Sequence, residues 1–343
     1  MTHPRSAVAM LASLALTMVA PDPAHAQTFV RAITGSGAET IGFAQGVAVD
    51  PANGNVVVAD TGNSRVLVFT ATGAHVLTIS GSGMLQPTGV AVDPSTGNIA
   101  VSDSVASLVL VFTSAGTFVT SMPAAQAYAV AIDAANGGNI VVTEVFNNLA
   151  RVYTPAGVLV RTIQGSGADA LDSPRAVAVD PANSNVLIAD YYNGRIQIFA
   201  SDGTFLRSLH PPTGGAAGDD PIAPFGVAVD PVNGNIVVSS EQPQRAIYVY
   251  NAAGAFVARV LPPTGAGGLD TALLGPSHVA IDPANGRNIV LADRSLNRMQ
   301  VYANTFGTQA ALPVPIDTLD TRTTILLSIA CLLLGAVALR RQA

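Results

Sequence analysis

The sequence is poor in the residues that carry most enzyme chemistry. It has no Lys, no Trp, a single Cys at position 331 and five His among 343 residues. One Cys excludes an intrachain disulfide. Charged residues make up only 11% of the chain and apolar residues 49%, so a sizeable buried core is available. The length allows one large domain or two ordinary ones.

Basic residues are outnumbered in the central part of the chain. Residues 27–322 contain 13 Arg and 21 acidic residues, a net charge of −8. Phosphate polymers and anionic lipids need a basic surface, so we expect no nucleic-acid partner.

The N-terminus has the layout of a secretory signal peptide. Arg5 precedes an apolar run over 7–20, and a small-x-small cleavage site ends at Ala26. We therefore expect residues 1–26 to be removed and the chain to be exported.

An uncharged run of 17 residues, 323–339, ends at Arg340 and Arg341. As a helix it would reach about 25 Å, nearly the thickness of a bilayer core. It predicts a transmembrane anchor over 323–343 with its arginines on the cytoplasmic side. A buried helix is the alternative.

Six copies of one motif divide the region between the two ends. They read GVAVD at 46, GVAVD at 89, AVAID at 129, AVAVD at 176, GVAVD at 226 and HVAID at 278. The spacings, 40 to 52 residues, are typical of β-propeller blades. Each unit reads as four apolar strands separated by Asp-Pro, Asn-Gly and other turn residues. We predict an all-β, six-bladed β-propeller over 27–306 with four-stranded antiparallel blades.

The last unit lacks its fourth strand. TFVRAITGSG at 28–37 resembles GVLVRTIQGSG at 157–167, which supplies the fourth strand of unit three. We therefore expect residues 28–33 to complete blade six, close the ring and cover its open edge.

The units resemble NHL repeats. VVVADTGNSRVLVF and VLIADYYNGRIQIF, from units one and four, follow that family's pattern best, and the resemblance extends over about 28–306. It implies a propeller but no particular activity, because one fold hosts many functions.

Two recurring polar patterns are interpreted as structural. Asp60 with Arg65, and Asp190 with Arg195, predict an ion pair that braces the loop between the second and third strands. Asp50, Asn53 and their equivalents predict side-chain capping of a turn rather than a calcium loop.

Enzymes with related propellers hold a metal in the central channel, using several His or an acidic cluster. After the signal peptide only His75, His210 and His278 remain. His75 opens an outer strand, His210 lies in a long loop, and His278 replaces the Gly at the start of an inner strand, so it is expected at a channel mouth. One His makes no zinc site, so we expect no metal and no cofactor. A metal-dependent lyase or lactonase is the alternative.

The loops offer the best candidate binding surface. Two long connections, 208–225 and 260–277, flank blade five on the face of the loops between strands two and three. The candidate binding residues are His210, Asp219, Asp220, Asp270 and His278. Neutral drift in loops that tolerate insertions is the alternative explanation for the length of these two connections.

The C-terminal region resembles the sorting tails of Gram-negative surface proteins, and is closest to the IPTL-CTERM kind. VPIDTLDTR lies before the apolar run and the Arg pair follows it. Residues 307–322 contain Pro313 and Pro315 and few apolar side chains, which predicts an extended stalk. The resemblance implies that a sorting protease cuts this stalk. We expect an exported, inner-membrane-tethered, non-catalytic propeller that binds a protein or glycan at the envelope. An assembly scaffold without a diffusible ligand is a third interpretation.

Overall fold

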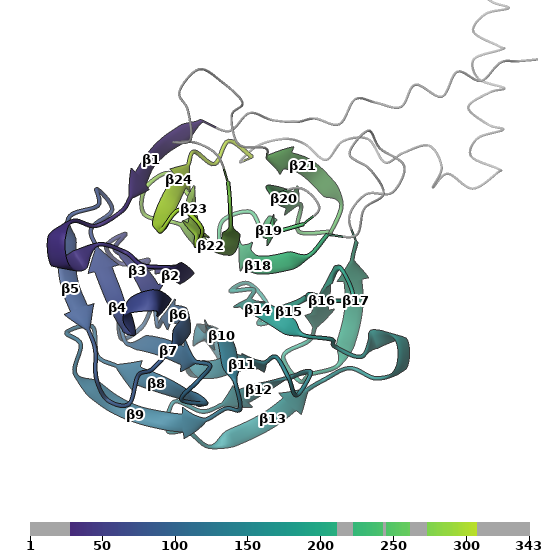
Figure 1. Ribbon diagram of the computed structural model, residues 1–343. Coiled ribbons are helices and arrows are strands. Elements are labelled where there is room, and N and C mark those ends of the chain that lie inside the picture. The colour runs from purple at the N-terminus through teal and green to yellow at the C-terminus, as the bar shows by residue number, and fades with distance from the viewer. Residues whose placement is uncertain (1–27, 211–221, 243–244, 261–272, 307–343) are drawn as a thin grey trace, which may run out of the picture.

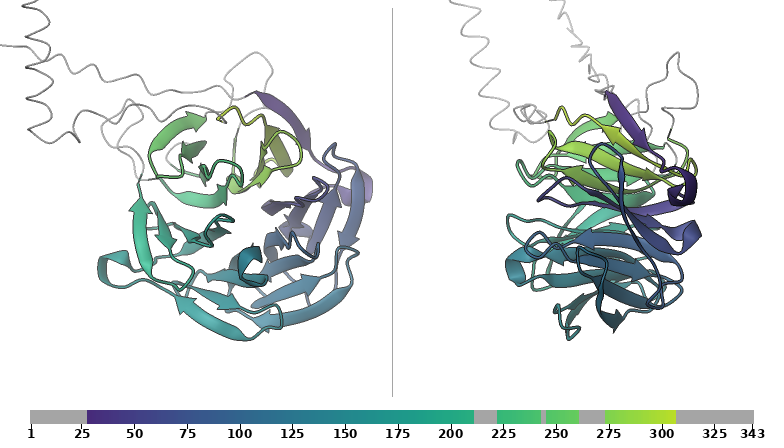
Figure 2. Two further views of the ribbon diagram at one scale, coloured as in Figure 1. Left: turned by 180° about the vertical axis from the view of Figure 1, so that it is seen from behind. Right: turned by 90° about the vertical axis from the view of Figure 1, so that its left-hand side faces the viewer.

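The computed structural model describes residues 28–210, 222–242, 245–260 and 273–306. Within them the chain forms six four-stranded antiparallel sheets arranged as blades around a central axis (Figure 1). Figure 2 shows the same ring from behind and from the side, where it is flattened. The predicted six-bladed propeller is confirmed. The signal peptide, the stalk and the apolar run at 323–339 lie outside the described residues.

The strands follow the chain blade by blade. Blade one contains β2 (Ala44–Val49), β3 (Val56–Asp60), β4 (Arg65–Phe69) and β5 (His75–Ile79). Blade two contains β6 (Pro87–Val92), β7 (Ile99–Asp103), β8 (Leu108–Phe112) and β9 (Phe118–Pro123). Blade three contains β10 (Ala127–Asp133), β11 (Asn139–Glu144), β12 (Leu149–Tyr153) and β13 (Leu159–Ile163). The turns include short 3-10 helices η1 (Gly37–Glu39), η2 (Thr61–Asn63), η3 (Ala134–Asn136) and η4 (Gly167–Asp169).

The second half of the ring repeats this order. Blade four contains β14 (Pro174–Val179), β15 (Val186–Asp190), β16 (Arg195–Phe199) and β17 (Phe205–Leu209). Blade five contains β18 (Pro224–Val229), β19 (Ile236–Ser240), β20 (Ala246–Tyr250) and β21 (Phe256–Val260). Blade six contains β22 (Pro276–Asp282), β23 (Asn288–Asp293) and β24 (Arg298–Tyr302), and takes its outer strand from β1 (Phe29–Ile33).

The closure of blade six by the N-terminal strand is confirmed. β1 pairs antiparallel with β24, with Ile33 opposite Met299 and Ala32 opposite Gln300 (Figure 1). Ile33 is buried in the core between blades six and one. Strands from the two ends of the propeller sequence therefore share one sheet.

The core is divided among the six interfaces between blades. Alternation along β3 shows why: Val56 and Val58 pack toward blade six, whereas Val57 and Ala59 pack toward blade two. Since successive side chains of a strand point to opposite faces, a strand between two blades must be apolar at every position. This accounts for the continuous apolar runs of the second strands.

Loop residues also join neighbouring blades. In four loops between second and third strands, a residue with positive φ bonds to the connection that leads into the next blade: Ser64, Ser107, Asn148 and Asn297. Ser64 Oγ donates to the Leu85 carbonyl at 2.6 Å, and Asn148 Oδ1 and Asn297 Oδ1 accept from the backbone N–H groups of Ser173 and Phe43 at 2.8 and 2.7 Å. These bonds fix the loops of one face relative to one another.

Candidate functional site

Each inner strand has an irregular register at the same place. In each inner strand the pairing with the second strand is interrupted just after the first paired residue, as between Ala44 and Val47 or between Pro174 and Ala176. Such bulges re-aim side chains and are frequent beside functional sites. The residues at the shift, one from each blade in order, are Gln45, Thr88, Tyr128, Arg175, Phe225 and Ser277.

Four of these residues and His278 meet across the centre of the ring. Gln45 Nε2, from blade one, donates to the Tyr128 hydroxyl of blade three at 3.0 Å. The Tyr128 ring lies 5.9 Å from Phe225 of blade five and stacks at 6.1 Å on His278 of blade six. Blades one, five and six are not neighbours of blade three, so these contacts fill the channel at this end. We call Gln45, Tyr128, Arg175, Phe225 and His278 the channel cluster.

Arg175 is the cation of the cluster. Its guanidinium lies 4.3 Å from the centroid of Tyr191, 5.0 Å from Phe225 and 5.3 Å from Tyr128. Nη1 donates to the Tyr128 hydroxyl at 3.3 Å. Aromatic faces attract a cation, and the surrounding rings fix the plane of the guanidinium.

A second cation lies close to Phe225. The Arg294 guanidinium lies 4.6 Å from the Phe225 ring and forms an ion pair with Glu241. Its charge is therefore compensated, unlike that of Arg175, for which the described residues supply no carboxylate partner.

Burial determines the protonation of the cluster. Chiefly through burial, the pKa of His278 is lowered to about 4. The nearby charges of Arg294 and Arg175 also lower this pKa, whereas hydrogen bonding to the backbone of Gln45 and Arg175 acts to raise it. His278 is therefore neutral at pH 7, and its Nδ1–H donates to the Gln45 carbonyl at 3.0 Å. Burial also raises the pKa of Tyr128, which stays protonated, although the charges of Arg175 and Arg294 oppose this shift.

A cavity of about 430 Å³ opens beside the cluster, within the usual range for ligand sites. Loops of blades two, three and four line it, and Tyr128 and Arg175 form part of its wall. Phe146 and Tyr192, 76% and 69% exposed, also line it. The remaining lining residues are Gln86, Ser104, Val105, Gln126, Val145, Asn148, Asp172 and Ser173. We call this space the blade 2–4 cavity.

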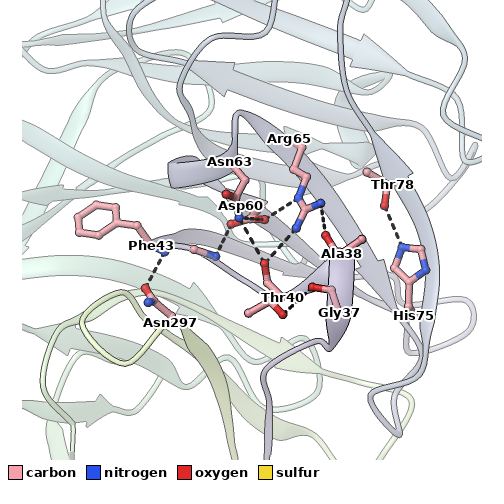
Figure 3. Close-up of polar contacts among 11 residues, drawn as sticks. Gly37, Ala38, Thr40, Phe43, Asp60, Asn63, Arg65, His75, Thr78 and Asn297 are labelled. Atoms are coloured by element: carbon pink, nitrogen blue, oxygen red, sulfur yellow. Dashed lines mark hydrogen bonds and ion pairs between the residues drawn. The ribbon is translucent and has the colours of Figure 1, made fainter.

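The repeated Asp and Arg residues brace loops, as predicted. Asp60 is fully buried and accepts from Arg65 Nε at 2.7 Å, Asn63 Nδ2 at 2.9 Å and the Gly42 N–H at 2.6 Å (Figure 3). Arg65 also donates to the carbonyls of Ala38 and Thr40 (Figure 3). The pair therefore joins the loop after β3 to the segment that enters the same blade.

Blade three has an acidic residue paired with an Arg at different positions. Leu149 occupies the position of Arg65, but Glu144 replaces the Asp and pairs with Arg151 at 3.1 Å. The turn prediction is confirmed as well: Asp50 accepts from the Ala52 N–H and Asn53 Nδ2, at 2.9 and 2.8 Å.

The predicted binding residues are not brought together. His210 is exposed and follows β17, an outer strand, whereas His278 is buried on an inner strand at the channel. Asp219, Asp220 and Asp270, and most of the two long connections, lie outside the described residues. His75 opens β5 and is exposed, as expected.

Neither a metal site nor a membrane-spanning helix occurs in the described part of the chain. No group of three or more His, Cys, Asp or Glu side chains in it is arranged to hold a metal ion. None of its helices is long and apolar enough to span a membrane.

Sequence reasoning missed Tyr128 and Arg175, although a signal was present. Both directly precede the Ala-Val of the repeated motif, where other units carry Gln, Thr, Phe or Ser. At this position of the repeat, blade three has a Tyr and blade four has an Arg, and both residues line the cavity.

Comparisons with known proteins agree with this architecture. Residues 42–69, 84–112 and 171–199, which belong to blades one, two and four, match the family model of the NHL repeat. A structural genomics protein of unknown function from Bacteroides thetaiotaomicron VPI-5482 has a similar structure, with a TM-score of 0.61 and 15% sequence identity over 83% of this chain and 73% of its own. At this identity the likeness shows the fold alone. No curated protein matches the sequence. The chain is a six-bladed β-propeller, and three of its blades match the NHL repeat.

Proposed function

We propose that the protein is a non-catalytic binding module at the bacterial envelope, and that it takes a protein or glycan ligand in the blade 2–4 cavity. One observation carries the proposal: two exposed aromatic side chains, Phe146 and Tyr192, line a cavity whose inner wall contains an uncompensated cation, Arg175. Large exposed aromatic side chains beside polar groups are typical of binding sites.

The scaffold suits binding. The cavity is lined by loops of adjacent blades, and bonds such as that from the Ser173 N–H to Asn148 hold these loops in place. Ligand-binding residues are commonly carried by loops on a rigid scaffold, because the loops vary without disturbing the core. A preformed site also loses less entropy when it binds.

No observation favours the metal-dependent enzyme. The described part of the channel offers one histidine, His278, whose Nδ1–H is already engaged with the Gln45 carbonyl. The rings and guanidinium of the channel cluster fill this end of the channel.

Location at the envelope rests on the sequence of the chain ends. A signal peptide over 1–26 and an apolar segment at 323–339 followed by two arginines support export and inner-membrane anchoring. The resemblance of the tail to sorting signals supports processing by a sorting protease. Cell fractionation tests the anchoring, and mass spectrometry tests the processing: an intact C-terminus at Ala343 in every fraction would rule out sorting.

The binding proposal is tested by presenting the purified full chain to an array of bacterial glycans and peptides. We expect specific binding that weakens about tenfold or more in the double variant Phe146→Ala/Tyr192→Ala, because burying aromatic anchors supplies much of the binding free energy. Val232→Ala, which removes an exposed apolar side chain from a turn after an inner strand, is the control. Binding that survives the double variant would move the site away from the cavity.

A further inference from the structure

We infer that the inner end of the blade 2–4 cavity binds the carboxylate group of an acidic glycan, through the Arg175 guanidinium and the Tyr128 hydroxyl. The inference rests on the proposed function and specifies its ligand.

Arg175 differs from three paired arginines of the loop face. Arg65 and Arg195 pair with buried aspartates, and Arg294 pairs with Glu241. Arg175 has no ion pair with any described residue, and of its nitrogens only Nη1 has a described acceptor, the Tyr128 oxygen. A guanidinium has five N–H donors in a planar fork that matches a carboxylate. A cation held among three rings in an acidic protein is therefore a receptor for an anionic group.

Tyr128 supplies a second donor at the same place. Its hydroxyl oxygen accepts from Gln45 Nε2 and from Arg175 Nη1. Both bonds use the oxygen lone pairs, and the described residues provide no acceptor for the hydroxyl hydrogen. Because burial raises the pKa of Tyr128, the hydrogen stays on the oxygen. Since Tyr128 and Arg175 line the same cavity, a ligand oxygen there meets both donors.

The walls of the cavity favour a sugar over a peptide. Peptide recognition draws much of its affinity from main-chain hydrogen bonds. Here the backbone N–H groups of Gln86, Ser104, Val105, Gln126, Asp172, Ser173 and Tyr192 are already bonded within the protein.

Side chains remain available instead. The amide NH2 groups of Gln86, Gln126 and Asn148 can donate, whereas the amide oxygens of Gln86 and Asn148 already accept from Ser104 and Ser173. The Asp172 carboxylate can accept from a pair of sugar hydroxyls. The exposed rings of Phe146 and Tyr192 offer flat faces for the C–H face of a pyranose ring. Asp172 also disfavours a ligand of dense negative charge, so we expect a sugar that combines carboxylate and hydroxyl groups, a uronic acid.

Isothermal titration calorimetry on the purified full chain tests the inference with three probes: oligogalacturonate, its methyl ester and oligoglutamate. We expect oligogalacturonate to bind, and its ester to bind about tenfold or more weakly, since esterification removes the charge that Arg175 receives. R175Q should lose about the same factor for the acid and little for the ester. Y128F should weaken the acid by several-fold.

R245Q is the matched control. Arg245 is exposed directly before β20, so this variant removes the same charge from the protein outside the cavity. Thermal melting confirms that each variant is folded. Equal losses in R175Q and R245Q would reduce the effect to net charge and overturn the inference.

The remaining outcomes distinguish failure of this inference from failure of the proposed function. If acid and ester bind equally and both depend on Phe146 and Tyr192, the binding module stands and the carboxylate site is wrong. If oligoglutamate binds and oligogalacturonate does not, the ligand is a peptide and the glycan inference is wrong. If none of the probes binds while the array gives a cavity-dependent ligand without a carboxylate, the inference fails alone.

Discussion

Single carboxylates hold two chain segments together at the ends of the second strands. Asp60 and Asp190 are fully buried, and each bonds to the Arg five residues later and to a backbone N–H of the segment that enters its own blade. A buried carboxylate requires such partners because its desolvation costs several kcal/mol. The recurring Asp and Arg pair therefore stabilises the blades, and its recurrence does not indicate a binding site.

Replacing Asp60 by Ala is expected to lower the free energy of unfolding by about 3 kcal/mol, because Arg65 and the Gly42 N–H lose their acceptor. Asp50→Ala, which removes a turn-capping carboxylate, should cost only about 1 kcal/mol. Denaturant unfolding measures both. Similar losses in the two variants would mean that the loop brace contributes no more than an ordinary turn.

His278 gives the stability a specific pH dependence. In the folded chain its pKa is lowered to about 4 from the ordinary 6.5, chiefly by burial. Between these values the unfolded state binds the extra proton, so stability falls as the pH falls from 6.5 to 4.

The variant His278→Gln keeps a donor for the Gln45 carbonyl but cannot titrate. Between pH 7 and pH 4 it should lose about 3 kcal/mol less unfolding free energy than the parent chain, following from the pKa difference. Carboxylates contribute equally to both proteins and cancel in the comparison. Parallel pH profiles would show that His278 is not held neutral by the fold.

At the scale of the strand, the bulge at the start of each inner strand connects packing to the site. The residue after the shift must be small where the next blade approaches closely. A Cβ on Gly89 would lie 2.9 Å from both the Tyr128 carbonyl oxygen and Ala129 Cα, and 2.7 Å from Ser102 Oγ. The close approach of the strands brings the bulged side chains to the channel.

Gly89→Ala should therefore destabilise the protein by about 1–3 kcal/mol, as expected for overpacking against backbone atoms. Ala176→Gly, at the equivalent place in blade four, removes a methyl group instead and is expected to cost about 1 kcal/mol. Denaturant unfolding measures the free energy of unfolding of both variants. A neutral Gly89→Ala would show that blades two and three are less tightly apposed at the channel.

Local patterns predicted the blades but not the site. The apolar runs at Val56–Asp60 and its equivalents, and the Asp-Pro and Asn-Gly turns, specify strands and turns from neighbouring residues alone. Even β1 could be placed, because its sequence repeats that of β13. Tyr128 and Arg175 lie 47 residues apart on separate blades, so only the packing of blade three against blade four brings them together. The cavity depends on loops of three blades, whose conformation the repeat pattern does not specify.

At the scale of the whole molecule, six similar interfaces form a closed ring in which each core lies between two blades. The interface between blades six and one differs in one respect, since it contains the N-terminal strand. The channel cluster takes residues from both sides of this closure, Gln45 from blade one and His278 from blade six. The geometry of the cluster therefore depends on the ring being closed.

Deleting residues 28–33 should lower the melting temperature, broaden the unfolding transition and weaken ligand binding, because β24 becomes an open edge and the sixth interface loses Ile33. Two point variants in β1 separate the contribution of a buried side chain from that of an exposed one. Ile33→Ala, at a side chain 2% exposed, should cost about 2–5 kcal/mol. Val30→Ala, in the same strand but 43% exposed, should change stability by about 0.5 kcal/mol or less. Thermal melting followed by circular dichroism and native-state proteolysis measure these changes. A deletion that melts like Val30→Ala would show that the ring holds without its N-terminal strand, and the pairing of β1 with β24 would then contribute nothing to closure.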